Sequence, residues 1–401
     1  MDALKYIEMI SDEHIFDLKK MGYKYSVEEV AELLDIMKAG AFRELSLTDF
    51  AEEENLVYVP SLLKSSAEAA KSLLGYRGNE PYGMLSLEDE IFSTFQIEQI
   101  DTSRESVRSI LAGKAPKDRE EHRVWGMKQG FEFIADRRNK ISRDSMRMLY
   151  ETAVNPYQTE SYAKLRENQM YRDGEVAVLN TLQEKKIHRG IAPEKIEEKM
   201  EQLFSFIQQD SDLDDLTKAA AIHFYIGYIH PYFDGNGRMA RLVHLWYLLQ
   251  KGYSAALFLP FSSLIQQSKA GYNKAYEKTE ANRKISGLVD ITPFLFYFQD
   301  CVYRKIGMQK LESNVLEQFS ELLKLGKLTG KEKELFHFVL SKYGTGEFST
   351  KMLERDFGDC AYATVRAFVL KLTDYGVLEH HAYGNRNRYC IAFPQHAVKK
   401  Q

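Results

Sequence analysis

Apolar residues recur every three or four positions along much of the chain. Ile91 and Phe95 share one side of a predicted helix, and Leu242, Leu245 and Leu249 share one side of another. This spacing is typical of amphipathic α-helices. We therefore expect a mainly α fold.

One segment, residues 174–193, departs from this pattern. Val176 and Val178 alternate with polar residues there, which predicts a two-stranded hairpin. A hairpin by itself is marginally stable, so we expect this one to lie on another part of the protein or on a ligand.

The chain divides into four predicted parts. The first is helical but turns at 58–60 and 78–83, where proline and glycine occur. The last contains three helices and a hairpin with a Gly384-Asn385 turn, and Ser349 caps its second helix. This order resembles a winged helix-turn-helix. The parts are a helical N-terminal region at 1–85, a central helical region at 86–310, a linker at 311–330 and a winged-helix-like domain at 331–395.

Composition narrows the class of protein. Hydrophobic residues make up 44% of the 401 residues and charged residues 28%, which suits a globular protein and argues against a disordered chain. No run of 18 apolar residues occurs, so no membrane span is expected. The first residues lack a signal-peptide core, and the three cysteines form neither a metal-spaced set nor a disulfide framework. These features favour a cytoplasmic location.

The stretch at 230–241 carries the chemistry. Its loop holds Gly235, Asn236 and Gly237 and opens onto a predicted helix, whose free N–H groups and dipole favour an anion. Arg238 and Arg241 lie three residues apart, on one face of the first turn of that helix. Two arginines beside such a nest predict a polyphosphate site.

Two further residues in this stretch suggest a reaction. Asp234 adds a carboxylate at the same place, which suggests a Mg²⁺ ion that bridges phosphate oxygens. His230 stands where the preceding helix ends, and an imidazole titrates near neutral pH, so it suits a general base. Taken alone, each residue has a structural explanation, such as a capping Asp234, but their concentration in twelve residues favours a site.

This stretch, HPYFDGNGRMAR, resembles the Fic motif, H-x-F-x-[DE]-G-N-G-R-x-x-R. The single departure is Tyr232 in place of phenylalanine, and its hydroxyl needs a partner if it is buried. Flanking features extend the resemblance over roughly residues 85–300. The resemblance implies a Fic-type helical bundle in which residues 174–193 form a flap that registers the target protein by strand addition. A purely structural hairpin is the alternative.

The resemblance also implies an activity, protein adenylylation. His230 would deprotonate a Ser, Thr or Tyr hydroxyl of a target protein, or of the chain itself, and that oxygen would attack the α-phosphate of ATP. Asp234 would hold Mg²⁺, and Gly235, Asn236 and Gly237 would form the anion hole. Arg238 and Arg241 would bind the outer phosphates.

A later segment, residues 271–279, resembles the part of the family beside the adenine pocket. Tyr272, Asn273 and Tyr276 are candidates for that pocket. Aromatic core packing is the alternative for the two tyrosines.

An upstream segment, at about 86–99, resembles the inhibitory helix of one Fic class. Thr94 and Glu98 match its motif, and Ser86 is the expected N-cap of the helix. The resemblance implies that Glu98 pairs with Arg241 and blocks productive ATP binding, or that it assists the reverse reaction, removal of AMP. Gln99 departs from the usual Gly or Asn, which adopt a left-handed helix end more easily. An exposed helical glutamate is the alternative.

The C-terminal part is weakly basic. Residues 331–401 hold 11 Lys and Arg against 8 Asp and Glu, whereas the whole chain carries a net charge of −4. Arg366 and Lys371 fall on the presumed recognition helix, and Arg386 and Arg388 on the presumed wing. This pattern allows DNA binding through 331–395. A protein-binding or packing role is the alternative.

Two other functions compete with adenylylation. One is a DNA-binding regulator whose Fic core senses a nucleotide without catalysis, and the other is transfer from another phosphate-containing donor. The presence of His230 favours an enzyme over a sensor, because a sensor needs no base. Apolar helix faces permit a homodimer without requiring one.

Overall fold

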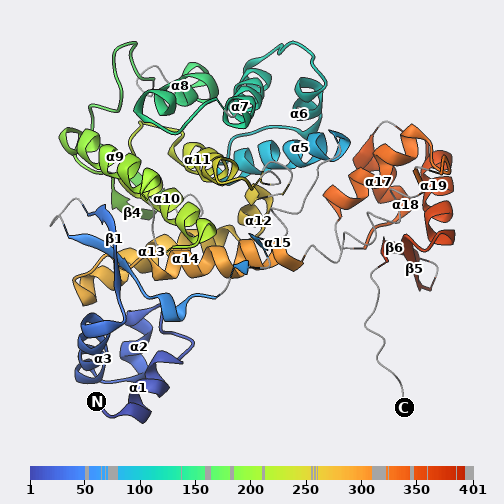
Figure 1. The fold of residues 1–401 in the computed structure, drawn as a ribbon. Helices are drawn as coiled ribbons and strands as arrows, with labels where there is room; N and C mark the ends of the chain where they lie inside the picture. The colour runs from blue at the N-terminus through green and yellow to red at the C-terminus, as the bar shows by residue number, and fades with distance from the viewer. Residues whose placement is uncertain are drawn as a thin grey trace, which may run out of the picture.

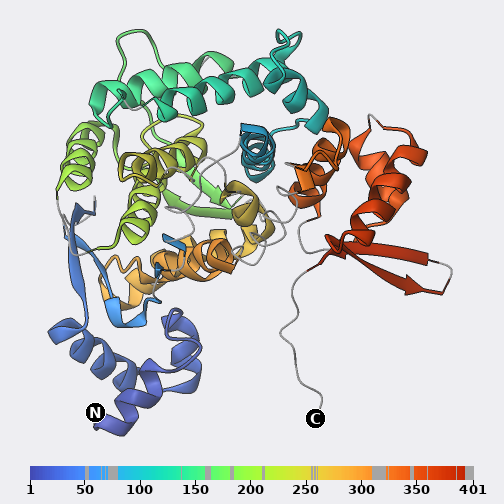
Figure 2. The same cartoon turned by 45° about the vertical axis from the view of Figure 1, so that its right-hand side comes forward.

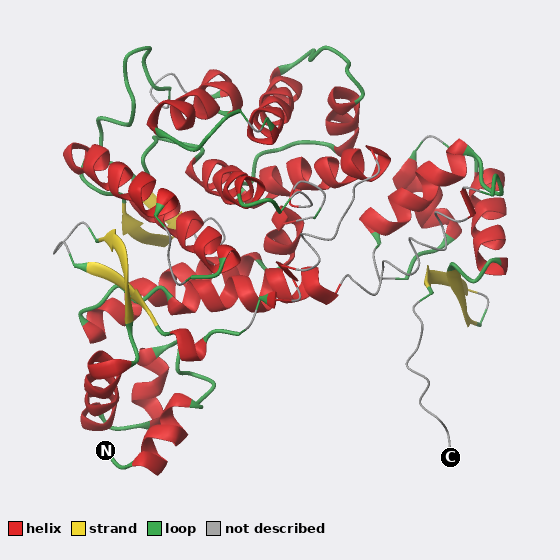
Figure 3. Ribbon diagram, viewed as in Figure 1, coloured by secondary structure: helices red, strands yellow, loops and turns green. Residues whose placement is uncertain are grey.

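The computed structural model confirms a mainly helical fold with few short strands (Figures 1 and 3). Three hydrophobic clusters give the described chain an N-terminal, a central and a C-terminal part. The structure describes residues 1–49, 54–64, 66–67, 69–70, 80–136, 138–158, 164–180, 185–209, 213–253, 256, 259, 261–308, 322–323, 325–343, 347–358, 360–384 and 386–392.

The N-terminal part begins with three helices, at the lower left of Figure 1: α1 (Ala3–Ile10), α2 (Leu18–Lys24) and α3 (Val27–Gly40). They share a small core of their own. Ser26 begins α3 with a capping box, since its hydroxyl accepts from the Glu29 N–H and the Glu29 carboxylate accepts from the Ser26 N–H.

An antiparallel pair follows, β1 (Arg43–Thr48) with β2 (Asn55–Tyr58), so this region is not wholly helical as we expected. The reason is long-range. The Val57 N–H donates to the Val289 carbonyl, and the Val57 carbonyl accepts from the Ile291 N–H. The strands thus pack into the central core rather than onto α1–α3. The turn expected at 58–60 is present, where the 3₁₀ turn η1 (Pro60–Leu62) begins.

Helix α5 (Glu80–Ile97) corrects two predictions. The turn expected at 78–83 is wrong over 80–83, and Ser86 lies inside the helix rather than at its N-cap. Pro81 is compatible with this start because proline needs no backbone hydrogen-bond partner in the first turn of a helix.

Two helices that pack on each other lie within the central part, α10 (Asp215–Ile229) and α11 (Asn236–Gln250). Both are buried on nearly every side, as expected for helices that are apolar all round. The surrounding elements are α6 (Arg104–Leu111), α7 (Arg119–Ala135), α8 (Arg143–Ala153), η2 (Asn155–Tyr157), α9 (Pro193–Gln208), α12 (Phe261–Gln267), α13 (Lys269–Ser286), α14 (Thr292–Tyr297), the π-helical turn η5 (Phe298–Tyr303) and α15 (Arg304–Met308).

The hairpin expected within 174–193 is present as β3 (Ala177–Asn180) and β4 (Lys185–Arg189), which pair antiparallel. It does not stand alone, since β4 packs against α13.

The C-terminal part has the expected order of three helices and a hairpin, at the right of Figures 1 and 2. Ser349 caps the second helix by accepting from the Met352 N–H. Much of the linker expected at 311–330 lies outside the described residues. The elements are α17 (Gly330–Lys342), α18 (Thr350–Phe357), α19 (Tyr362–Asp374), β5 (Leu378–Tyr383) and β6 (Arg386–Ile391).

This C-terminal part packs on the central one through α17, which lies against α5. Arg108 of α6 forms the polar part of the contact. Its guanidinium lies 4.8 Å from the centre of the Phe338 ring, and it also pairs with Glu88 of α5 at 2.8 Å.

Two of the four basic residues predicted to face DNA are engaged within the protein, Arg388 with the Met352 sulfur and Lys371 with a carboxylate. Lys371 lies 2.9 Å from both carboxylate oxygens of Glu332 on α17. Arg366 and Arg386 are exposed. DNA binding through this part stays a prediction.

None of the helices in the described part of the chain combines the length and apolar character needed to cross a membrane.

Candidate active site

His230 is the residue at which α10 ends. Its backbone is left-handed, with φ 57° and ψ 61°, which turns the chain sharply into the loop. Its Nδ1 lies 3.2 Å from the Gly227 carbonyl oxygen. Since a carbonyl only accepts, this contact assigns a proton to Nδ1 and leaves Nε2 as the nitrogen that can act as a base. The ring is therefore prepared to take a proton through Nε2.

The loop after His230 is held in shape by hydrogen bonds from the Asn236 side chain. The buried Asn236 amide accepts from the Tyr232 N–H at 2.9 Å and donates to the Tyr232 carbonyl at 2.8 Å. Its side chain therefore holds the loop together, and only its backbone N–H remains for the predicted anion hole.

The departure at Tyr232 is accommodated by stacking. Its ring lies 3.8 Å from that of Tyr150, nearly parallel, and the Tyr150 hydroxyl donates to the Asp234 carbonyl at 3.1 Å. The Tyr232 hydroxyl is buried and has no hydrogen-bond partner among the described residues. A phenylalanine would avoid that cost.

The N-terminus of α11 has the geometry of an anion-binding site. Gly235 takes φ 79°, which favours glycine, and no described side chain caps the helix. The Gly235 N–H donates to Asp234 Oδ1, and the following N–H groups belong to the first turn of α11, where no intrahelical partner exists. The structure thus gathers the residues of the 230–241 motif around one helix N-terminus.

Two arginines converge on this N-terminus. The side chains of Arg238 and Arg241 are each only 4% exposed. Arg238 Nε and Arg241 Nη1 are buried without a partner among the described residues. Arg238 Nη2 lies 3.4 Å from Asp234 Oδ2, a long contact. Buried guanidinium donors need hydrogen-bond acceptors, and an anion between two arginines would supply acceptors and also compensate their charge.

Glu98 lies over the same place, just after the last residue of α5. Its Oε1 is 2.6 Å from Arg241 Nη2, and Arg241 Nε donates to the Thr94 hydroxyl at 2.6 Å. A Cβ on Gly237 would clash with Glu98 Oε1, so a side chain there would displace the carboxylate. Burial raises the pKa of Glu98, but Arg241 and then Arg238 lower it more, so the pKa lies below its usual value. The carboxylate is therefore charged at neutral pH.

Gln99 ends the α5 segment in a left-handed conformation, with φ 56°. The backbone thus has the geometry that Gly or Asn would adopt more easily, at a cost of about 1 kcal/mol for a residue with a Cβ. The helix end is retained despite the departure from the motif.

Asp234 suits a magnesium ion. Its side chain is 54% exposed at the edge of the arginine pair, which leaves the carboxylate accessible. Magnesium is commonly held by one or two carboxylates together with substrate phosphates. The donor set therefore fits Mg²⁺ bound jointly with a nucleotide.

The candidates for the adenine pocket are placed less favourably. Tyr272 is buried, and its hydroxyl lies 2.9 Å from Nε2 of the buried His223. Tyr276 stacks on Phe224, with ring centres 5.2 Å apart. Both tyrosines thus take part in the aromatic core, which was the alternative. Asn273 is half-buried on the same helix, and its role stays a prediction.

The structure adds Arg172, which the sequence did not single out. Its buried guanidinium donates to the His230 carbonyl at 2.7 Å, to the Gly174 carbonyl at 2.6 Å and to the Ile191 carbonyl at 2.5 Å. Burial lowers the pKa of Arg172 to about 10, so it remains charged. One arginine thereby joins the His230 loop to both ends of the β3–β4 hairpin.

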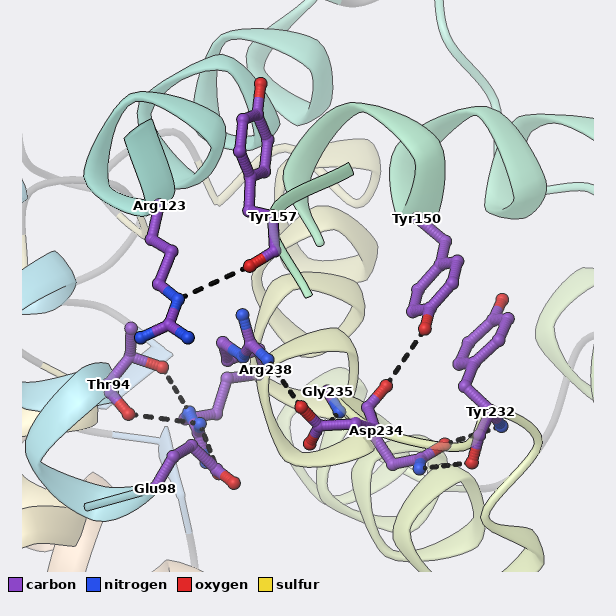
Figure 4. Close-up of polar contacts among 11 residues, drawn as sticks. Thr94, Glu98, Arg123, Tyr150, Tyr157, Tyr232, Asp234, Gly235 and Arg238 are labelled. Atoms are coloured by element: carbon purple, nitrogen blue, oxygen red, sulfur yellow. Dashed lines mark hydrogen bonds and ion pairs between the residues drawn. The ribbon is translucent and has the colours of Figure 1, made fainter. Parts of the chain in front are cut away.

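Arg123 of α7 is a second addition. It donates to the Tyr157 carbonyl at 3.3 Å, and its guanidinium lies near Arg238 (Figure 4). Burial and then the charges of Arg119 and Arg238 lower the pKa of Arg123. A third cation thus borders the anion site. Nothing in the sequence around Arg123 or Arg172 marks them, because their partners are largely backbone carbonyls.

The class of protein follows from comparisons with known sequences. Residues 135–248 match the Fic/DOC family, so the chain contains a Fic domain, as the 230–241 motif indicated. The match is narrower than the expected extent of 85–300.

Curated relatives are similar over a limited stretch. Protein adenylyltransferase fic-1 of Caenorhabditis elegans is 28% identical over 152 residues, which cover 36% of this chain and 26% of that protein. Its counterpart in Caenorhabditis briggsae is 24% identical over 238 residues, 56% of this chain and 42% of that protein. The chain thus spans less than half the length of these relatives.

A solved structure supports the fold over more of the chain. A Fic family protein from Desulfovibrio desulfuricans G20 superimposes with a TM-score of 0.53 and covers 83% of this chain and 96% of its own. At 18% identity this likeness shows the fold alone.

Proposed function

We propose that the chain is an ATP-dependent protein adenylyltransferase that Glu98 restrains. The observation that carries the proposal is the convergence of two buried arginines, Arg238 and Arg241, on an uncapped helix N-terminus beside His230. This arrangement favours a polyphosphate held next to a base. The names of the curated relatives, which are adenylyltransferases, agree with it.

In this proposal, His230 Nε2 accepts the proton of a Ser, Thr or Tyr hydroxyl on a target protein. The hydroxyl oxygen bonds to the α-phosphorus of ATP, the bond to the β-phosphate bridging oxygen breaks, and pyrophosphate leaves with that electron pair. The N–H groups at the start of α11 bear the charge that develops on the α-phosphate. Mg²⁺ held by Asp234 would supply further neutralisation of phosphate charge.

The remaining residues position these groups. Arg238 and Arg241 bind the outer phosphates, and Arg172 holds the His230 loop in register with the β3–β4 hairpin. We propose that this hairpin presents the target segment by strand addition. Fixing nucleophile and nucleotide relative to each other contributes to the rate together with the electrostatic stabilisation of the phosphate charge.

Glu98 acts as the brake. While it occupies Arg241 at 2.6 Å, that guanidinium is unavailable to the γ-phosphate, and ATP binds without a productive arrangement. In the reverse reaction, removal of AMP from a modified protein, the same carboxylate would orient the attacking water.

The test is labelling with α-³²P-ATP and Mg²⁺ in a cell lysate, with wild type, Glu98→Gly and Glu98→Gly/His230→Ala compared. We expect label on the chain itself or on a lysate protein with Glu98→Gly, and none with the double variant. No label in any lane, with all three proteins folded, would contradict transfer from ATP.

Competition by a panel of nucleotides and other phosphate-containing donors would then identify the donor. If unlabelled ATP is the only compound that removes the label, ATP is the donor and the transferred group is adenylyl. If another compound competes more strongly than ATP, that compound is the donor.

A further inference from the structure

The C-terminal hairpin gathers a second set of chemically reactive side chains, outside the 230–241 motif. Glu379, His381 and Cys390 each place one potential ligand atom within 4.8 Å of the others. Within the described part of the chain, this is the only cluster of at least three such residues.

The strand register explains why they meet. Glu379 of β5 stands directly opposite Cys390 of β6. His381 lies two residues beyond Glu379, on the same face of the hairpin, because side chains alternate along a strand. The backbone pairing therefore brings the three side chains to one face of the hairpin.

A third segment completes the arrangement. Phe348 pairs antiparallel with Tyr389, which places the preceding residue, Glu347, beside Cys390. Glu347 Oε1 lies 2.6 Å from His381 Nδ1. His381 Nε2 lies on the opposite side of the ring, 3.7 Å from Glu379 Oε2. A histidine that binds a metal through one ring nitrogen usually donates a hydrogen bond from the other nitrogen to a carboxylate. Glu347 is in the position of that carboxylate, and His381 Nε2 points toward the other potential metal ligands.

The three potential ligand atoms indicate which kind of metal ion the cluster would bind. A thiolate, an imidazole and a carboxylate together favour zinc or a similar divalent transition ion over Mg²⁺ or Ca²⁺, which prefer oxygen alone. In a tetrahedral zinc site the ligand atoms lie about 3.3–3.7 Å apart, as follows from the usual bond lengths. The His381 Nε2 to Glu379 Oε2 distance of 3.7 Å lies in that range, and all three ligand atoms lie within 4.8 Å of one another, so the side chains would have to move closer only slightly to bind one ion.

We propose that Cys390, His381 and Glu379 bind a divalent cation of the zinc type, with Glu347 orienting His381. Three protein ligands leave the fourth position to water or to a group from outside. The site ties β5, β6 and the segment before α18 together. Arg388 shares this face, but its guanidinium donates to the Met352 sulfur at 2.8 Å and so is engaged beside α18. The proposal is independent of the adenylylation chemistry.

The test uses Co²⁺ as the probe, on the full chain freed of metal by chelation, with Mg²⁺ in excess to occupy oxygen-only sites. We expect a cysteine-to-cobalt charge-transfer band in the near ultraviolet, which Zn²⁺ abolishes in competition. Cys390→Ser should lose the band, whereas Cys360→Ser, the matched cysteine in the same part of the chain, should keep it.

A pair of neighbouring histidines gives a second matched control. His381→Ala should weaken Co²⁺ binding at least tenfold. His380→Ala should not, because His380 is on the other face of the hairpin, where its Nε2 contacts Asn387 at 2.8 Å. Glu347→Gln should weaken binding about 10-fold while keeping the band, as expected for a residue of the outer shell.

A measurement on the unmodified protein covers the case in which a variant fails to fold. Zn²⁺ should protect Cys390 from alkylation at least tenfold, as read by peptide mass spectrometry, and leave Cys360 unchanged. Absence of the cobalt band in wild type, its persistence in folded Cys390→Ser, or alkylation of Cys390 at the same rate with and without Zn²⁺ would each overturn the proposal.

Discussion

Removal of the Glu98 carboxylate should tighten ATP binding. In Glu98→Ala, Arg241 loses its ionic partner but keeps its hydrogen bond to the Thr94 hydroxyl at 2.6 Å. The guanidinium thus stays in place, and the N–H group that bound Glu98 becomes available to a phosphate. Glu98→Gln should give an intermediate result, because a neutral amide oxygen is a weaker acceptor for Arg241 than a carboxylate.

The magnitude follows from the geometry of the pair. The Arg241 side chain is 4% exposed, the Glu98 side chain is 25% exposed, and the contact is 2.6 Å, which places it among hydrogen bonds between charged, largely buried groups. Such bonds contribute about 1.5–3 kcal/mol. If ATP must break this bond to engage Arg241, its removal should lower the Kd for ATP by about 10- to 100-fold.

The assay is isothermal titration calorimetry with ATP and with AMP, on wild type, Glu98→Ala and a control, Glu105→Ala. Glu105 is an exposed glutamate on α6, so its variant should bind both nucleotides like wild type. AMP lacks the outer phosphates, so Glu98→Ala should change its Kd by less than about threefold, around 0.6 kcal/mol. Equal tightening of ATP and AMP, or no tightening of ATP, would refute the assignment of Arg241 to the outer phosphates.

Four other substitutions test separate parts of the reasoning. His230→Ala should abolish transfer and leave the Kd for ATP within about threefold by calorimetry, because the base does not hold phosphate; full activity would contradict its role. Arg172→Met should lower kcat at least about tenfold and reduce the protection of the 174–191 segment in hydrogen exchange, because the loop and hairpin lose their shared donor; unchanged exchange would argue against positioning. Tyr232→Phe should stabilise the protein by about 1 kcal/mol in urea unfolding, because it removes a buried hydroxyl without a described partner; destabilisation would reveal one. Burial raises the pKa of Glu90 to about 7, so folding favours the neutral carboxyl group. The wild-type protein therefore loses stability as the pH rises from near 4.5, the pKa of the group in the unfolded chain, to about 7. Compared with wild type, Glu90→Gln should be about 3 kcal/mol more stable at pH 8 and less than about 1 kcal/mol more stable at pH 5.

Local patterns predicted the parts of the molecule whose contacts are local. The 230–241 loop is built from residues within twelve positions of one another, and the β3–β4 hairpin pairs neighbouring segments. The resemblance to Fic proteins added the one long-range contact that was expected, between Glu98 and Arg241.

Contacts between distant backbone groups escaped prediction. The β2 strand is paired with Val289 and Ile291, and Arg172 binds three carbonyl oxygens. Every residue supplies a carbonyl, so no side-chain pattern marks such a partner. The early start of α5 was missed for a different reason: a proline in the first turn of a helix cannot be told from a proline in a loop by sequence.

The contact between α17 and α5 has a thermodynamic consequence. Helix α5 packs against α17, and its Glu88 pairs with Arg108 of α6, which lies over Phe338 of α17. The C-terminal end of α5 places Glu98 at the phosphate site. If a ligand of the C-terminal part shifts α5 and changes ATP affinity by some factor, ATP must change the affinity of that ligand by the same factor. This coupling is reciprocal. Nucleotide binding would therefore change the affinity of α17–α19 for their own ligand, without any contact between the two ligands.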